Sequence, residues 1–139
     1  MAQSLQQVPL ENPGSFVVHV VDDDEAVRDS LRALLESHGF EVRDYSSARA
    51  FLLGPPVQLR ACMLLDVHMP GMSGLELLDA LYARGSTLPV IAITGRGDSL
   101  LRERVVRAGA LIMLDKPVAD DTLLSSLLRA LSLAECPAD

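Results

Sequence analysis

The segment Phe16-Val-Val-His-Val-Val-Asp-Asp-Asp-Glu25 decides the fold, because an apolar run stops abruptly at four consecutive carboxylates. Apart from His19, which we expect to be a satisfied core histidine rather than a ligand, residues 16–21 are apolar at every position. That pattern is typical of a strand buried on both faces of a parallel sheet. Acidic residues suit the start of a helix, and Asp24 is the predicted N-cap.

The same order of strand and helix recurs along the rest of the chain. After the first strand at 16–21, strands are predicted at 41–45, 61–65, 89–93 and 111–114. Helices are predicted between Asp24 and Gly39, over 47–53, from near Gly74, over 99–108 and over 120–133. Five alternating units predict an α/β, doubly wound (βα)5 fold. Its five-stranded parallel sheet has the order 2-1-3-4-5, with helices on both faces.

Length and composition indicate one domain with an aliphatic core. The chain has 139 residues, of which 49% are hydrophobic and only 4% aromatic. We expect a flexible N-terminal arm over 1–15, a single domain over 16–133 and a C-terminal tail over 134–139.

Charge and cysteine content exclude several classes of protein. A formal net charge of −7 argues against nucleic-acid or anionic-membrane binding by this domain. Cys62, expected to be buried, and Cys136 do not form a disulfide framework. No apolar stretch has membrane-spanning length and no signal peptide is recognisable, so we expect a cytoplasmic protein.

Polar side chains gather where the predicted strands end. Strand one ends at Asp22 and Asp23, strand three at Asp66 and strand four at Thr94, and Lys116 follows strand five. In this fold, ligands bind outside the carboxyl ends of the strands, at the switch point between strands one and three. We therefore expect three carboxylates, a hydroxyl and an ammonium group at one edge.

This set of groups suits phosphoryl transfer. Three crowded carboxylates repel one another unless a cation is present, and oxygen ligands favour Mg²⁺. Asp66 is a competent nucleophile that can form an aspartyl phosphate. Lys116 can neutralise the transferred oxygens, and Thr94 can donate a hydrogen bond to them. By contrast, Asp24 and Glu25 need no role beyond starting the helix.

Four motifs resemble the signatures of CheY-like receiver domains of two-component response regulators. They are Val-Val-Asp22-Asp23-Asp-Glu, Asp66-Val-His-Met-Pro-Gly-Met-Ser-Gly74, Ile-Thr94-Gly and Asp-Lys116-Pro117. Their order and their placement at strand ends make the match specific over Phe16 to Leu133. The stretch Ile-Thr94-Gly-Arg-Gly-Asp98 is most similar to receivers of FixJ-type transcription regulators.

The resemblance implies a role for each site residue. Asp66 would accept a phosphoryl group from a phosphohistidine of a sensor histidine kinase or phosphotransfer protein. Asp22, Asp23, Asp66 and the backbone carbonyl of His68 would bind Mg²⁺. Thr94 would be the switch hydroxyl and Lys116 the phosphate partner, followed by a cis bond to Pro117. Such a protein is a signalling switch rather than an enzyme, with self-catalysed phosphotransfer and autodephosphorylation only.

One position departs from the family pattern. Receivers usually carry Tyr or Phe three residues before the conserved Lys, but here that residue is Met113, preceded by Ile112 where an acidic residue is usual. Met113 either makes a softer version of the aromatic switch, leaves coupling to backbone shifts nearby, or is ordinary core.

An output surface is predicted on the fourth helix. Leu101, Val105 and Ala108 share its inward side, whereas Val106 falls among charged residues on the outer side. In similar receivers this helix, strand five and the last helix form a dimer or output face, although a plain solvated face is the alternative.

Two other functions compete with the receiver interpretation. A small Mg²⁺-dependent phosphatase of the haloacid dehalogenase type would carry a second Asp where His68 stands. A pseudo-receiver would bind partners without phosphorylation. The sequence also leaves open whether the domain acts alone through a protein partner or with a C-terminal DNA-binding domain, as FixJ-type regulators do.

Overall fold

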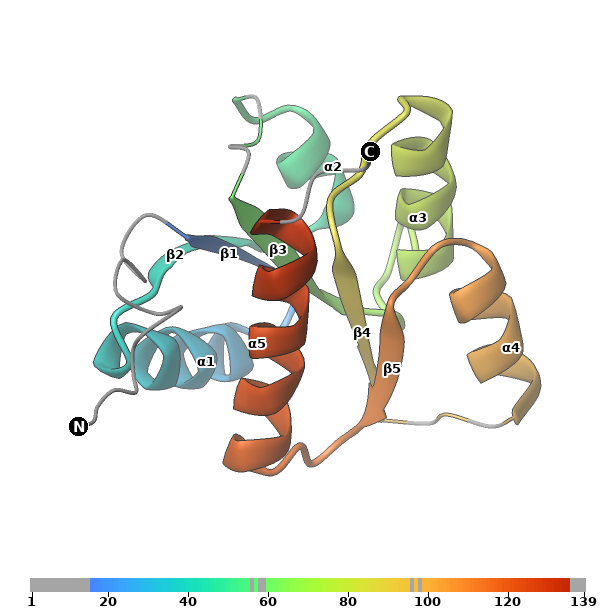
Figure 1. The fold of residues 1–139 in the computed structure, drawn as a ribbon. Coiled ribbons are helices and arrows are strands. Elements are labelled where there is room, and N and C mark those ends of the chain that lie inside the picture. The colour runs from blue at the N-terminus through green and yellow to red at the C-terminus, as the bar shows by residue number, and fades with distance from the viewer. Residues whose placement is uncertain (1–15, 56, 58–59, 96, 98, 136–139) are drawn as a thin grey trace.

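Five strands and five helices alternate along the chain (Figure 1) in a computed structural model that describes residues 16–55, 57, 60–95, 97 and 99–135. The predicted arm at 1–15 and the end of the predicted tail, with Cys136, lie outside the described residues. The elements are β1 (Val17–Val21), α1 (Glu25–Ser37), β2 (Glu41–Tyr45), α2 (Ala48–Leu52), β3 (Ala61–Asp66), α3 (Gly74–Ala83), β4 (Val90–Thr94), α4 (Ser99–Arg107), β5 (Ile112–Asp115) and α5 (Asp120–Glu135).

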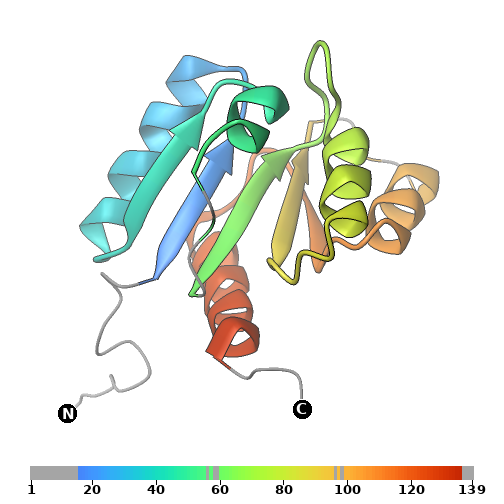
Figure 2. The ribbon, with the colours of Figure 1, turned by 90° about the horizontal axis from the view of Figure 1, so that it is seen from above.

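The strands form one parallel sheet in the predicted order β2-β1-β3-β4-β5 (Figure 2). The first strand, β1, is an interior strand. The strand β2 pairs with one of its edges, and β3 pairs with the other, followed outward by β4 and β5. The direction of winding therefore reverses between β1 and β3. The carboxyl ends of these two central strands meet at the switch point where such folds bind ligands.

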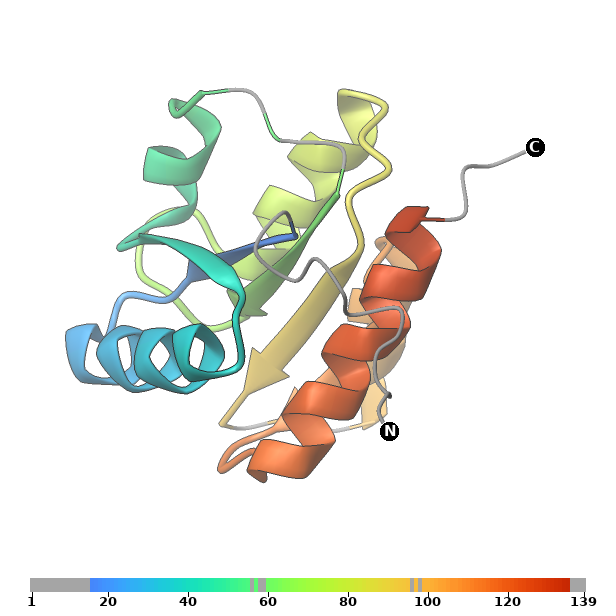
Figure 3. The ribbon, with the colours of Figure 1, turned by 60° about the vertical axis from the view of Figure 1, so that its left-hand side comes forward.

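Each face of the sheet is covered by its own hydrophobic cluster, because the side chains of a strand alternate between its two faces. Val18 and Val20 of β1 pack with Leu35 of α1 and Leu127 of α5. Val21 belongs to the other cluster, with the helices α2, α3 and α4, to which Phe51, Leu77 and Val105 contribute. Figure 3 shows α1 and α5 together on one side of the sheet.

Local signals set the helix ends. The Asp24 side chain accepts hydrogen bonds from the backbone N–H groups of Ala26 and Val27, so the predicted N-cap is confirmed. Ser73 and Glu76 form a capping box at the start of α3. Gly39 follows α1 with φ of 89°, a left-handed conformation that glycine adopts without strain.

Membrane insertion and the cysteine can be judged on the described part of the chain. None of the helices there has both the length and the apolar character needed to cross a bilayer. Cys62 is buried in β3 as predicted, and burial raises the pKa of its thiol.

The prediction that His19 is a satisfied core histidine is confirmed for its burial but wrong for one ring nitrogen. Its ring is buried among Tyr45 and Phe51, with ring centroids 5.8 Å and 5.4 Å away. Nδ1 lies 3.2 Å from the Tyr45 hydroxyl, but Nε2 has no hydrogen-bond partner among the described residues. Burial, with a smaller contribution from the charge of Arg43, lowers the pKa of His19 to about 4.

The depressed pKa of His19 predicts that acid destabilises the fold. Below the unfolded pKa of 6.5 the unfolded chain binds a proton that the folded chain refuses until about pH 4. Stability is therefore lost as the pH falls through this window, by at most about 3 kcal/mol. Urea unfolding of wild type and His19→Leu at pH 7 and pH 4.5 measures the effect. The loss between the two pH values should be smaller in the variant, and equal losses would contradict this assignment.

Candidate functional site

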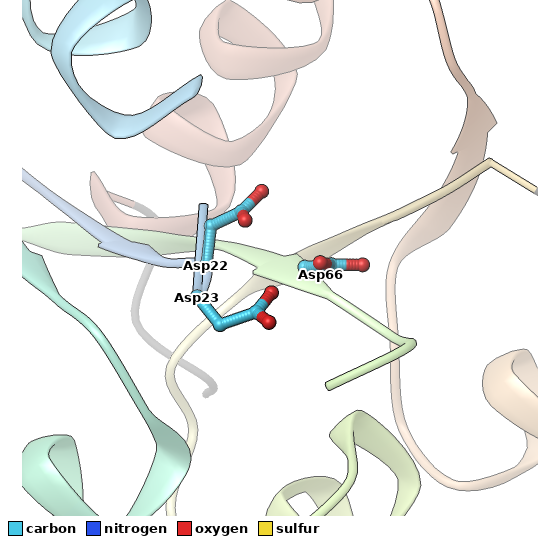
Figure 4. A group of neighbouring side chains, drawn as sticks. All are labelled: Asp22, Asp23 and Asp66. Carbon is cyan, nitrogen blue, oxygen red and sulfur yellow. The ribbon is translucent and has the colours of Figure 1, made fainter. Parts of the chain in front are cut away.

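The acidic groups of β1 and β3 converge because the two strands are neighbours in register. Val21 pairs with Leu65, so the residues that follow them lie at the same edge of the sheet. Figure 4 shows the side chains of Asp22, Asp23 and Asp66 gathered there. Each offers a carboxylate oxygen within 4.8 Å of the others. The predicted convergence of these three carboxylates is thus found in the structure.

Asp22 is buried and held from several sides. Its backbone N–H donates to the carbonyl of Tyr45 in β2, at 3.2 Å. Its Oδ1 accepts a hydrogen bond from the Asp24 backbone N–H at 2.9 Å, and its Oδ2 lies 3.4 Å from Lys116 Nζ. Asp23, in contrast, is exposed, so one of the three carboxylates faces solvent.

Asp66 ends β3 and is also buried, with 6% of its surface exposed. Its Oδ1 accepts a hydrogen bond from the His68 backbone N–H at 3.1 Å, and its Oδ2 lies 3.7 Å from Lys116 Nζ. Burial, followed by the charge of Asp22, raises the pKa of Asp66, while Lys116 and the His68 amide oppose that rise. The charged form of Asp66 is therefore short of compensating positive charge.

Lys116 reaches the site from the end of β5, which is an edge strand of the sheet. Its ammonium lies between Asp22 and Asp66, and its backbone N–H donates to the Thr94 carbonyl at 2.7 Å. Thr94 itself is fully buried at the end of β4. The Lys116–Pro117 peptide is cis, as the resemblance implied. The structure thus brings the cation from β5 to the carboxylates of β1 and β3.

A pocket opens beside the Asp66 carboxylate. It has a volume of about 310 Å³ and is lined by Asp66, His68, Gly95 and Lys116. A phosphoryl group that entered it would meet the carboxylate of Asp66 and the ammonium of Lys116. Arg96 and Asp98 lie outside the described residues.

The donor set fits a hard divalent cation. Three carboxylates and one ammonium leave a formal charge of −2 at the cluster, which a divalent ion balances. Carboxylate oxygens and water are the ligands that Mg²⁺ prefers. Asp22, Asp23 and Asp66 are the residues that would hold it, while the contribution of the His68 carbonyl stays a prediction.

Met113 is buried in the cluster that α2, α3 and α4 share. A Cβ atom at Gly97 would lie 2.9 Å from Met113 Cε, 2.8 Å from Thr94 Cγ2 and 2.6 Å from Asp115 Oδ1. Gly97 therefore lies directly against the residue that replaces the usual aromatic group. Sequence reasoning missed this contact, although Gly97 lies in the Thr94-Gly-Arg-Gly stretch that it had singled out.

A second close approach fixes the loop that follows Asp66. A Cβ atom at Gly74 would lie 2.7 Å from Val67 Cα and 3.0 Å from the Asp66 carbonyl oxygen. The start of α3 therefore lies against the backbone of the phosphoacceptor candidate, and only glycine fits there. In the sequence, Gly74 was noted as a helix start but not as a packing requirement.

The family model for the response regulator receiver domain matches residues 18–128. The chain belongs to this family. In this receiver domain the acidic cluster occupies the place where receivers bind Mg²⁺, and phosphorylation on an aspartate is the general function of the family. It is thus a signalling switch of the kind that receives phosphate from histidine kinases, rather than a classical enzyme.

Similar proteins include transcription regulators named FixJ. The receiver is 48% identical over 116 residues to the transcriptional regulatory protein FixJ of Azorhizobium caulinodans, covering 83% of this chain and 54% of that protein. It is 42% identical over 118 residues to FixJ of Bradyrhizobium diazoefficiens, covering 85% of this chain and 58% of that protein. The crystal structure of FixJ-N matches with a TM-score of 0.78 and 38% identity, over 89% of this chain and 97% of that one. The receiver therefore spans about half the length of the FixJ proteins of Azorhizobium caulinodans and Bradyrhizobium diazoefficiens.

The close approach of Gly74 predicts a strict requirement for glycine. Gly74→Ala should lower the free energy of unfolding by about 1–3 kcal/mol, since its Cβ would press on the Asp66–Val67 backbone. Gly95→Ala is the matched control, because its Cβ would approach only Lys116 Cδ, at 4.0 Å. Urea unfolding of both variants checks this, and equal stabilities would show that the α3 start can shift without cost.

Proposed function

We propose that Asp66 of this receiver accepts a phosphoryl group from the phosphohistidine of a sensor histidine kinase or phosphotransfer protein. The proposal is supported by one observation: Asp66 opens onto a pocket while lying against Asp22, Asp23 and Lys116. An Asp66 oxygen bonds to phosphorus as the phosphorus–nitrogen bond of the donor breaks. The electron pair of the broken phosphorus–nitrogen bond stays on the imidazole nitrogen of the donor histidine. The nucleophile is a carboxylate, so no general base is needed.

The other site residues handle charge. Asp22 and Asp23, with Asp66, would hold Mg²⁺, and the bound ion would neutralise charge on the transferred phosphoryl oxygens. Lys116 already lies 3.7 Å from Asp66 Oδ2 and supplies a second positive charge to the same oxygens. The Thr94 hydroxyl donates a hydrogen bond to a phosphoryl oxygen once Asp66 is phosphorylated. Hydrolysis of the aspartyl phosphate by water resets the switch.

We further propose that output uses the face formed by α4, β5 and α5. Leu100 and Val106 of α4 expose 64% and 46% of their surface, beside charged neighbours. Arg102 of α4 donates to the Met113 carbonyl at 2.7 Å and to Asp115 Oδ2 at 3.1 Å. Because Asp115 precedes Lys116, a movement of Lys116 toward the phosphoryl group is linked to the position of α4.

The partner of this face depends on the whole protein. The relatives carry names of transcription regulators and are longer than this chain. We propose a cytoplasmic protein in which this face mediates a homodimer or contacts an output partner. DNA contact would belong to a separate domain rather than to the receiver, whose net charge is −7.

Intact mass spectrometry after incubation with acetyl phosphate and Mg²⁺ tests the phosphorylation. Wild type should gain a single phosphoryl adduct that requires Mg²⁺, whereas Asp66→Ala should gain none because the nucleophile is gone. Lys116→Ala should be labelled more slowly, since one positive charge is lost from the site. If wild type stays unlabelled while a known receiver is labelled in parallel, the chain is a pseudo-receiver. Continuous release of inorganic phosphate from a monoester substrate would favour the phosphatase alternative.

Sedimentation velocity with and without acetyl phosphate and Mg²⁺ tests the output face. Phosphorylated wild type should associate, and Val106→Asp should abolish this because a buried unpaired carboxylate is costly at an interface. Leu53→Asp is the control, since Leu53 is also an exposed apolar residue, with 78% of its surface exposed against 46% for Val106, but follows α2. Association that survives Val106→Asp unchanged would place the interface elsewhere.

A further inference from the structure

We infer that Arg28 of α1 is a positioning residue that orients the Asp22–Asp23 peptide and so sets the affinity of the site for Mg²⁺. This inference rests on the proposed function, because it concerns the same acidic cluster. Arg28 Nη1 donates a hydrogen bond of 2.7 Å to the backbone carbonyl oxygen of Asp22. Its side chain is only 15% exposed, so the guanidinium is held beneath the site rather than in solvent.

Asp44 of β2 fixes the guanidinium in place. Its Oδ2 lies 3.6 Å from Arg28 Nε, and its Oδ1 accepts a hydrogen bond of 2.9 Å from Arg32 Nη2. Asp44 pairs with Val20 in the sheet, and the next residue, Tyr45, accepts the Asp22 N–H. The Asp22 backbone is therefore held by β2 at both ends: directly at its N–H, and through Asp44 and Arg28 at its carbonyl.

This arrangement acts on metal binding through the planarity of the peptide bond. The carbonyl of Asp22 and the N–H of Asp23 belong to one rigid plane. Holding the carbonyl therefore limits rotation about the bonds on either side, which set the direction of both carboxylates. Asp23 is exposed, and among the described residues no side chain forms a hydrogen bond that orients its carboxylate. Mg²⁺ demands near-ideal octahedral geometry, so a small rotation of this peptide weakens binding.

The sign of the effect separates positioning from simple charge. A guanidinium near a divalent cation is repulsive, so removing its charge would tighten Mg²⁺ binding if only long-range electrostatics mattered. Positioning predicts the opposite. A role confined to fastening α1 to β2 would change the free energy of unfolding but leave the Mg²⁺ affinity of the folded protein unaltered.

Calorimetric titration of the full chain with MgCl₂, well below its melting temperature, tests the inference. Arg28→Met should weaken Mg²⁺ binding by roughly tenfold, the size expected when a residue that supports a metal ligand is lost. Arg28→Lys keeps the charge but cannot bond both the Asp22 carbonyl and Asp44, so it should also weaken binding. If Arg28→Met does not fold, the Mg²⁺ affinity of Arg28→Lys alone tests the inference. Arg107→Met is the matched control, because Arg107 pairs with Glu103 on α4, away from the site.

A double variant shows whether Asp44 acts through Arg28. Asp44→Asn should weaken Mg²⁺ binding less than Arg28→Met, and adding it to Arg28→Met should produce no further loss. Equal or tighter Mg²⁺ binding by both Arg28 variants would overturn the inference while leaving the proposed function intact. Absence of Mg²⁺ binding and of the Asp66 adduct in wild type would instead refute the proposed function itself, and this inference with it.

Discussion

The crowding of three carboxylates at the ends of β1 and β3 is the constraint on which the rest of the site depends. Asp22 and Asp66 are both buried, and a single ammonium from Lys116 lies between them. Burial and the charge of Asp22 raise the pKa of Asp66, so the cluster lacks positive charge. That shortage makes the site receptive to a divalent cation, and the pocket beside it gives a phosphoryl group access to the carboxylate.

The surroundings of the cluster hold it at a fixed geometry against this repulsion. Gly74 lets the start of α3 lie on the Asp66 backbone, and Asp24 caps α1 while its N–H binds Asp22. On the other side, Arg28 and Asp44 connect the same peptide to β2. The helices α1 and α3 therefore contact the site as well as the core.

The end of β5 connects this chemistry to the outer surface. The Lys116 N–H binds the Thr94 carbonyl, and Arg102 reaches from α4 to Met113 and Asp115. Gly97 lies so close to Met113 and Thr94 that no side chain fits between them. If Asp66 is phosphorylated as proposed, these packed contacts would supply a physical route from Asp66 to α4 in a receiver without the usual aromatic group. The flexible thioether of Met113 can follow small shifts of the loop.

Sequence by itself predicted the strand order, the Asp24 N-cap and the gathering of Asp22, Asp23, Asp66 and Lys116 at one edge of the sheet. Buried strands and helix starts follow local periodicity, and right-handed crossovers between alternating units give the strand order. The functional role of each site residue stays a prediction. The sequence could not determine that His19 Nε2 has no hydrogen-bond partner in the described part of the chain, that Gly74 and Gly97 are closely packed, or that Arg28 binds the Asp22 carbonyl. Those features arise between elements distant along the chain, or from side-chain directions that no pattern encodes. Tertiary structure decided them because contact distances depend on how the helices pack against the sheet.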